Sequence, residues 1–451
     1  MTIVEMREPS SGRSPVASPS ASVSQPAGEL AYRGGRWRLF GLAFSRMVLT
    51  IVTLGVGRFW MVTRLRRHYW SSLEIDGAPL EYTGRASEKL IGFLIAVVIL
   101  AVYLTVVNLA LTFIGLSYFQ GHLLALQLPL LALIPFVPWA IYRARRYILA
   151  RTRWRGIRFG MEPGAWGFSR RYLQWWALTL LSFGLLYPLM QLRLSQFATD
   201  RSFYGDLQFR QEGRLKPLMR SWLWVWAPTP IVIGLAIIAG VQIGAEGFER
   251  LAAEAAKETG DDASANPREI TLIGGVVIAA FLALIWSLIA YVRHRVFSFR
   301  YLSSNKVLGG RTRLEFSIRT WPVVGVYFRG YLIIQIGVAI AVIAVALLTL
   351  IGLALAGADI QAIADAMEAG SGDFAAAPTL IFAAAVYFTF IVVSISLTHA
   401  FISHPLLRKV VATTRIHDLA GAARARQRAH DEQAEAGGFA DALGADNGGA
   451  F

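Results

Sequence analysis

Residues Leu90–Tyr142 read LIGFLIAVVILAVYLTVVNLALTFIGLSYFQGHLLALQLPLLALIPFVPWAIY and contain no Lys, Arg, Asp or Glu. A helix needs about 20 apolar residues to cross the hydrocarbon core of a bilayer, so this run is long enough to cross twice. The segment Phe119-Gln120-Gly121-His122 interrupts the run near its middle and predicts a turn between two helices. The stretch therefore predicts a helical hairpin that spans a membrane.

The rest of the chain has the same character. Only 16% of the 451 residues are charged and 55% are hydrophobic, whereas about a quarter of the residues of soluble domains are charged. Further uncharged runs cover Tyr172–Leu192, Ser221–Ala245, Ile270–Val292, Gly330–Ala358 and Phe374–Leu407. The last four pair by their order into two more hairpins. The sequence thus predicts an all-α polytopic membrane protein with three transmembrane helical hairpins.

The charges of the connecting segments predict the orientation. Residues 246–269 and 359–373 join the members of the second and third hairpins, and they carry seven and four acidic residues against three and no basic ones. Residues 143–171 carry nine Arg and one Glu, and residues 293–329 carry eight basic residues and one acidic. Since Lys and Arg near helix ends stay in the cytoplasm, we expect the basic segments and both termini there, with the acidic loops outside.

Two shorter apolar segments do not fit this alternation. Met47–Thr63 and Tyr172–Leu192 have basic residues on both sides, so a full crossing would leave one basic flank outside. Each contains a central glycine, Gly55 or Gly184, where the backbone can reverse. We therefore favour two short re-entrant or interfacial segments over full crossings, and an eight-span bundle is the alternative.

Composition restricts the remaining possibilities. The chain has no Cys, which excludes disulfides, zinc–thiolate sites and iron–sulfur clusters. Residues 1–34 and 416–451 are rich in small and polar residues and predict disordered cytoplasmic tails around a membrane domain at 35–415. Basic cytoplasmic loops account for the net charge of +15, and no nucleic-acid-binding module accompanies it, so we expect no nucleic-acid partner.

An internal repeat marks the basic segments. Three copies share a spacing of 17 residues that ends at a turn glycine: Trp60 to Gly77, Trp139 to Gly156, and Pro188 to Gly205. A looser fourth copy has its turn at Gly309-Gly310. Apolar and polar residues alternate after each turn, which predicts small cytoplasmic β elements that pair with one another.

The residues around the first two copies predict a lipid interface. Trp prefers the headgroup level of a bilayer, and Arg side chains extend to lipid phosphates. The lipid-interface candidates are Trp60, Arg64, Arg66, Arg67, Trp139, Arg143, Arg145 and Arg146. We expect them to contact the bilayer, mainly its anionic headgroups.

Several short stretches resemble a known family. They are Leu39-Phe40-Gly41, Leu49-Thr50-Ile51-Val52-Thr53-Leu54-Gly55, Phe59-Trp60, Asp76-Gly77, Tyr82-Thr83-Gly84 and Pro138-Trp139-Ala140 with the Arg cluster that follows. They are similar to the YjgN-like family of bacterial inner-membrane proteins, and the resemblance covers about residues 35–415. It implies a location in the bacterial inner membrane. Because that family is a domain of unknown function, it implies no catalytic or binding residue.

No motif indicates chemistry. The seven His show no compact metal spacing and no catalytic or nucleotide-binding signature is complete, so we expect no enzyme activity, metal or cofactor. Polar residues within apolar runs are candidates for a pathway: Asn108, Gln174, Gln242 and Gln335. Uncharged polar groups also join helices by hydrogen bonds. Two functions stay open: a transporter or channel, and a non-catalytic scaffold that binds anionic lipid or a cytoplasmic partner through basic loops.

The orientation can be tested because the chain has no Cys. A Lys257→Cys variant, in the acidic loop 246–269, should react with an impermeant maleimide while the inner membrane is intact, since the loop lies outside. Arg153→Cys, in the basic segment 143–171, should react only after that membrane is permeabilised. The opposite pattern of labelling would contradict the orientation.

Overall fold

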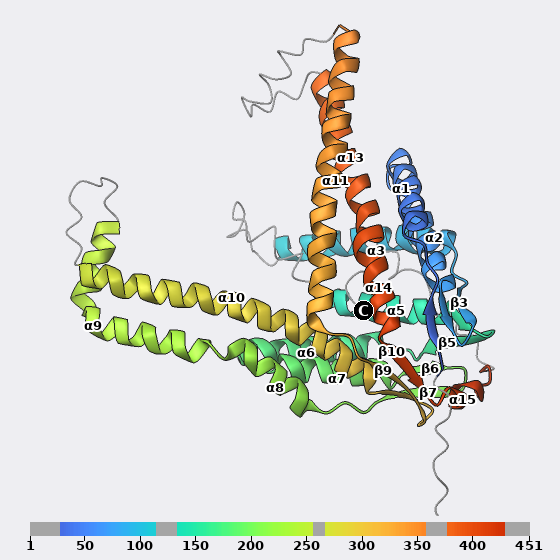
Figure 1. The fold of residues 1–451 in the computed structure, drawn as a ribbon, viewed down its shortest axis with the longest axis horizontal. Coiled ribbons are helices and arrows are strands. Elements are labelled where there is room, and N and C mark those ends of the chain that lie inside the picture. Colours follow the sequence, from blue (N-terminus) through green and yellow to red (C-terminus); the bar gives the residue numbers. More distant parts are fainter. Residues whose placement is uncertain (1–27, 114–132, 256–266, 358–376, 429–451) are drawn as a thin grey trace, which may run out of the picture.

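The computed structural model describes residues 28–113, 133–255, 267–357 and 377–428 (Figure 1). Most of these residues are helical, but they also form one ten-stranded antiparallel sheet whose strands follow chain order from β1 to β10. The predicted mainly helical fold is therefore confirmed, but the class is not all-α, because the small β elements predicted beside the helices join into one ten-stranded sheet. Short strands are marginal alone, and pairing copies from successive segments gives every strand neighbours.

Five units with the order strand, helices, strand make up this fold. The first two units are β1 (Leu30–Tyr32), α1 (Arg36–Val52), α2 (Arg58–Ser71) and β2 (Leu73–Ile75), then β3 (Ala78–Tyr82), α3 (Ala86–Phe113), α5 (Phe136–Ala150) and β4 (Thr152–Trp154). The third is β5 (Ile157–Met161), α6 (Ala165–Leu181), α7 (Tyr187–Thr199) and β6 (Ser202–Tyr204). The fourth is β7 (Leu207–Gln211), α8 (Leu215–Trp226), α9 (Thr229–Ala255), α10 (Pro267–Ser304) and β8 (Lys306–Leu308). The fifth is β9 (Thr312–Phe316), α11 (Thr320–Leu355), α13 (Ala377–Thr398), the π-helical turn η2 (His399–Ser403), α14 (His404–Ala412) and β10 (Thr414–His417), followed by α15 (Leu419–Ala423).

One backbone hydrogen bond recurs at the same place in every unit. The residue just after the first strand donates its N–H to the carbonyl of the residue just before the second strand, at 2.8 to 2.9 Å. The five donor–acceptor pairs are Arg33 with Ser72, Thr83 with Arg151, Glu162 with Arg201, Glu212 with Asn305, and Ser317 with Thr413. We call this bond the unit clamp. It fixes where the helices of each unit leave the sheet and return to it.

Glycine-containing turns connect consecutive units, as the repeat predicted. Asp76-Gly77 has φ of 50° and 72°, and Arg155-Gly156 has φ of 48° and 78°. Positive φ at both turn residues matches the right-handed twist of the strands they join. Gly205 has a φ of 55° at the first position of its turn, and Gly309-Gly310 form the fourth. The small β elements predicted at these turns are therefore confirmed, and they pair as β-hairpins.

The first and last strands nearly close the sheet into a ring. The N–H of Gly28 donates to the carbonyl of Ile416 at 3.1 Å. The same two units also meet outside the sheet, since His404 Nε2 lies 2.9 Å from the backbone carbonyl oxygen of Gly34. Closure leaves few unpaired strand edges. β1 and α15 both lie in segments predicted to be disordered tails, so the boundaries predicted at 34 and 416 leave out several folded residues.

The buried core lies where the helices meet the sheet. Trp154, Tyr204 and Leu308, from three different units, pack in one cluster. Tyr142, Phe168 and Phe197 pack in a second cluster between α5, α6 and α7. Smaller buried clusters lie between α1 and α2, and between α11 and α13, so the core extends from the ring along these helices.

Five helical segments are long and apolar enough to cross a membrane: Ala86–Ala110, Leu215–Gly244, Ile270–Ser304, Thr320–Leu355 and Leu380–Ala412. α11 packs along α13 and α9 along α10, and the two pairs leave the ring in different directions (Figure 1). Their apolar side chains are largely exposed, which suits contact with lipid. The turn predicted at 119–122 lies outside the described residues.

The two shorter apolar segments form helical hairpins. α1 contacts α2 and is joined to it through Leu54-Gly55, whose φ values are 50° and 96°. α6 contacts α7 and is joined to it through Phe183-Gly184, whose φ values are 51° and 87°. Leu54 is 95% exposed and Phe183 is 83% exposed. The chain thus reverses at the glycines noted in the sequence, and each hairpin presents an apolar tip.

Gly205→Ala should destabilise the ring more than Gly77→Ala. Both positions have positive φ, which costs an L-residue about 1–2 kcal/mol. A Cβ on Gly205 would also overlap Arg426 O and lie 2.9 Å from Ile157 Cγ2, whereas a Cβ on Gly77 meets nothing within 4 Å. We expect the lower Tm for Gly205→Ala in detergent. Equal Tm values for the two variants would contradict the packing of residue 426 against the third turn.

A candidate anion-binding cavity

Helices from all five units line one cavity on the helical side of the ring. Its volume is about 840 Å³. Representative lining residues are Trp70 of α2, Arg145 of α5, Gln191 of α7, Arg295 of α10 and Tyr327 of α11. In each unit the unit clamp sets where the helices meet the sheet, so the cavity is a product of the ring as a whole.

Positive charge dominates this cavity. Its described lining contains Arg145, Arg295 and Lys306 and no acidic residue. Within the part of the chain that the structure describes, neither the Arg295 guanidinium nor Lys306 Nζ makes a hydrogen bond or an ion pair. Burial, and secondly the nearby Arg145, lower the pKa of Lys306 to about 7. Cations that line one hollow without an acidic counter-charge favour an anionic ligand.

The remaining lining is mainly apolar. Ile148, Val296, Phe299 and Val323 belong to this wall. Its neutral polar groups are Gln191, Ser195, Ser298 and Ser303 together with the phenols of Tyr291 and Tyr327. A site of this composition matches an amphiphilic anion, because the cations can hold the charged group while the wall covers an apolar chain.

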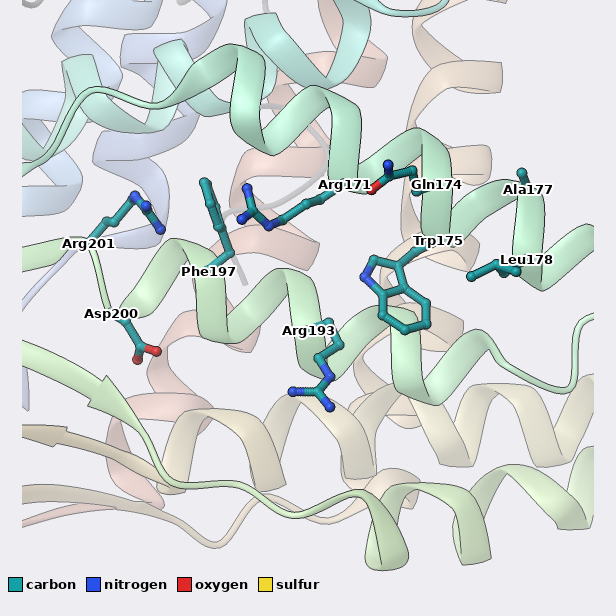
Figure 2. Close-up of a pocket in the computed structure, with 9 residues that line it drawn as sticks. All are labelled: Arg171, Gln174, Trp175, Ala177, Leu178, Arg193, Phe197, Asp200 and Arg201. Atoms are coloured by element: carbon teal, nitrogen blue, oxygen red, sulfur yellow. The ribbon is translucent and has the colours of Figure 1, made fainter.

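A second hollow lies between α6 and α7 (Figure 2). Its volume is about 800 Å³, and we call it the α6–α7 groove. It is lined by Arg171, Gln174, Trp175, Ala177, Leu178, Arg193, Phe197, Asp200 and Arg201. The predicted pathway residue Gln174 therefore lies in this groove and not in the central cavity.

The first set of lipid-interface candidates divides between two environments. Trp60, Arg64 and Arg67 line a small hollow of about 280 Å³ on α2 and are exposed. Arg66 differs from the prediction, because only 9% of it is exposed and its Nη1 donates to the Tyr82 hydroxyl at 3.2 Å. A buried guanidinium of this kind supports the packing of β3 against α2.

The second set of lipid-interface candidates, from Trp139 to Arg146, is also divided between different surroundings. The Arg143 guanidinium stacks over Trp139, with Cζ 4.9 Å from the ring centroid. Arg146 Nε donates to Met161 O at 3.0 Å, which ties α5 to β5. Arg145 lines the cavity. Arg66 and Arg145 each follow their Trp by six residues, yet they face different surroundings.

Sequence reasoning missed Arg295 and Lys306. Both lie in the basic segment 293–329, and that excess of positive charge was the available signal. The pairing of Lys306 with Gln211 in β7 places it at the start of β8, beside the helices of other units. No local pattern reveals that position.

The four predicted pathway residues do not come together. Asn108 on α3, Gln242 on α9 and Gln335 on α11 are exposed on separate helices. Gln242 Oε1 accepts a hydrogen bond from Arg268 at 3.3 Å. None of the four lines the cavity. Among the described residues, no group of three or more His, Cys, Asp or Glu could hold a metal ion.

The structure is thus a near-closed ring of strands that carries five helical segments long and apolar enough to cross a membrane. The profile of a family described as a bacterial protein of unknown function, DUF898, matches residues 27–343. The chain belongs to this family. The match covers the first four units and most of α11. Comparisons with curated proteins and with solved structures found no match.

Lys306→Met should stabilise the protein most at low pH. The pKa of Lys306 is lowered from 10.5 to about 7, so below pH 7 the folded state holds a charge that its surroundings disfavour. As pH rises from about 7 toward 10.5, the folded state has lost this proton while the unfolded state keeps it, and the stability of the natural protein rises. The Tm advantage of Lys306→Met, measured without added lipid, should therefore shrink between about pH 6 and about pH 9.

The exposed Lys216 provides the control for this experiment. Lys216→Met should show no such dependence on pH. An advantage of Lys306→Met that grows with pH would contradict the lowered pKa.

Proposed function

We propose that this protein is a multi-pass protein of the bacterial inner membrane that binds an anionic lipid in its central cavity, without catalysing a reaction. The observation that carries the proposal is the pair of cations, the exposed Arg295 and the half-buried Lys306, which line one cavity beside an apolar wall without an acidic partner among the described residues. A carboxylate or phosphate headgroup would neutralise them, and its acyl chain would cover the wall.

The proposed topology places the ring in the cytoplasm. The basic segments 143–171 and 293–329 contain β4, β5, β8 and β9, and segments rich in Arg and Lys stay inside. Both termini are cytoplasmic in this topology. The α9–α10 and α11–α13 pairs cross the bilayer as hairpins, and α3 also crosses it. α10 and α11 have 38 and 36 residues, which is about 57 and 54 Å of helix, so both still cross a core of about 30 Å when tilted.

The α1–α2 and α6–α7 hairpins enter the cytoplasmic leaflet and return in this topology. Their reversals at Gly55 and Gly184 and their exposed apolar tips support re-entry over crossing. The exposed Trp60, Arg64 and Arg67, and the stacked Trp139 and Arg143, then lie at the headgroup level.

Binding without chemistry fits the groups that line the cavity. They are cations, amides, hydroxyls and apolar side chains, and the described lining includes no carboxylate or imidazole. Transport is a second prediction. It rests on the central cavity alone, because the four polar residues predicted to form a pathway lie on separate helices. The narrower resemblance to the YjgN-like family also stays a prediction.

Replacing both cations should weaken retention of anionic lipid. Each basic group near an anionic headgroup contributes about 1 kcal/mol, so Arg295→Gln/Lys306→Gln should lower the affinity by about 30-fold. The measurement is native mass spectrometry of protein released from nanodiscs that contain phosphatidylglycerol and phosphatidylcholine. The natural protein should retain phosphatidylglycerol selectively.

The matched control removes two exposed cations outside the cavity, Arg210→Gln/Arg220→Gln. It changes the net charge equally and should retain the lipid. Equal loss of phosphatidylglycerol in both variants would show that net charge, and not this site, causes the effect. Unchanged retention in Arg295→Gln/Lys306→Gln would refute the proposed site.

A further inference from the structure

The α6–α7 groove has a cationic end and an apolar end. At the end nearer the sheet lie Arg171, on α6, and Arg201, just after α7. From Arg171 the lining of α6 continues through Trp175 to Leu178, at one-turn intervals toward the reversal. The tip beyond is apolar, with Phe183 83% exposed. The groove therefore has the polarity of a phospholipid along its length.

Two guanidinium groups share one aromatic ring at the cationic end. The Cζ atoms of Arg171 and Arg201 lie 4.5 and 3.9 Å from the centroid of Phe197, and the two side chains approach the ring from its two sides (Figure 2). Stacking holds the planes of both groups through cation–π attraction. It leaves N–H donors at their edges for an anion.

These charges have no acidic partner within the described residues. Arg171 Nη1 donates to Gly167 O at 3.2 Å, and Arg201 makes no side-chain hydrogen bond or ion pair. The one acid of the lining, Asp200, accepts a hydrogen bond from Gln211 N at 2.8 Å, and its carboxylate points away from the side of α7 on which Phe197 lies (Figure 2). Two like charges on one ring favour a bound anion.

We propose that the α6–α7 groove binds one phospholipid of the cytoplasmic leaflet, with its phosphate at Arg171 and Arg201 and an acyl chain along Trp175 and Leu178. A free phosphate would use the cationic end alone, and the apolar surface of Trp175, Ala177 and Leu178 is what selects the lipid. The exposed Arg193, which also lines the groove, adds a third positive charge.

This inference shares with the proposed function only the placement of the α6–α7 hairpin at the membrane. The groove and the central cavity have no lining residue in common. Variants of Arg295 and Lys306 should therefore weaken lipid binding in the cavity without changing lipid binding in the groove. Each of the two proposals can thus be refuted independently of the other.

The test uses the full chain in nanodiscs of phosphatidylcholine with a minor fraction of phosphatidic acid. Native mass spectrometry then counts the phosphatidic acid molecules retained. Arg171→Gln/Arg201→Gln should reduce the affinity of the groove by about 30-fold, from about 1 kcal/mol for each base. Arg170→Gln/Arg210→Gln, which removes two exposed charges outside the groove, should not.

Two further variants separate a lipid site from a phosphate site. Leu178→Ser should shorten the residence of the lipid while both arginines remain. Arg171→Lys/Arg201→Lys should retain more lipid than Arg171→Gln/Arg201→Gln, and it also checks that a chain changed at both positions folds. Inorganic phosphate at millimolar concentration should not displace the lipid. Unchanged retention in Arg171→Gln/Arg201→Gln, no effect of Leu178→Ser, or displacement by inorganic phosphate would each overturn the proposal.

Discussion

The unit clamp is the interaction on which the rest of the structure depends. Each strand of the sheet has only three to five residues, too few to be stable in isolation. The clamp extends the strand pair of every unit by one hydrogen bond at the point where the helices begin and end. Repeated five times and joined by glycine turns, it sets each pair of helices beside the next. The bridge between Gly28 and Ile416 then leaves little open edge.

The same arrangement explains the concentration of positive charge. Basic residues gather at the cytoplasmic ends of membrane helices, where they oppose translocation. The ring brings the helix ends of five units together, so charges that are far apart in the sequence, such as Arg145, Arg295 and Lys306, share one cavity. Arg171 and Arg201 meet at Phe197 for the same reason, since α6 and α7 belong to one clamped unit. An anionic lipid is the counter-charge that a membrane supplies.

Local signals predicted much of this fold. The charge-free runs gave the long helices, the central glycines gave the reversals at Gly55 and Gly184, and the spacing of 17 residues gave the hairpins at Gly77 and Gly156. The ring itself depends on pairing between strands distant in sequence, which no local pattern encodes. The environments of Arg66 and Arg145 also differ for this reason: the two follow the same motif, but Tyr82 covers only the first. Lys306 was missed because its place in the cavity follows from its register with Gln211.

Closure of the ring can be measured most directly by cross-linking its first strand to its last. Residues 29 and 415 flank the bridge between Gly28 and Ile416, and both are exposed. Opposed residues of antiparallel strands have Cα atoms about 4.5–5.5 Å apart, which is within reach of a disulfide. In membranes under mild oxidation, Glu29→Cys/Arg415→Cys should form a disulfide within one chain, and Glu29→Cys/Arg210→Cys should not. The absence of the first disulfide, or its formation only between chains, would contradict the closed ring.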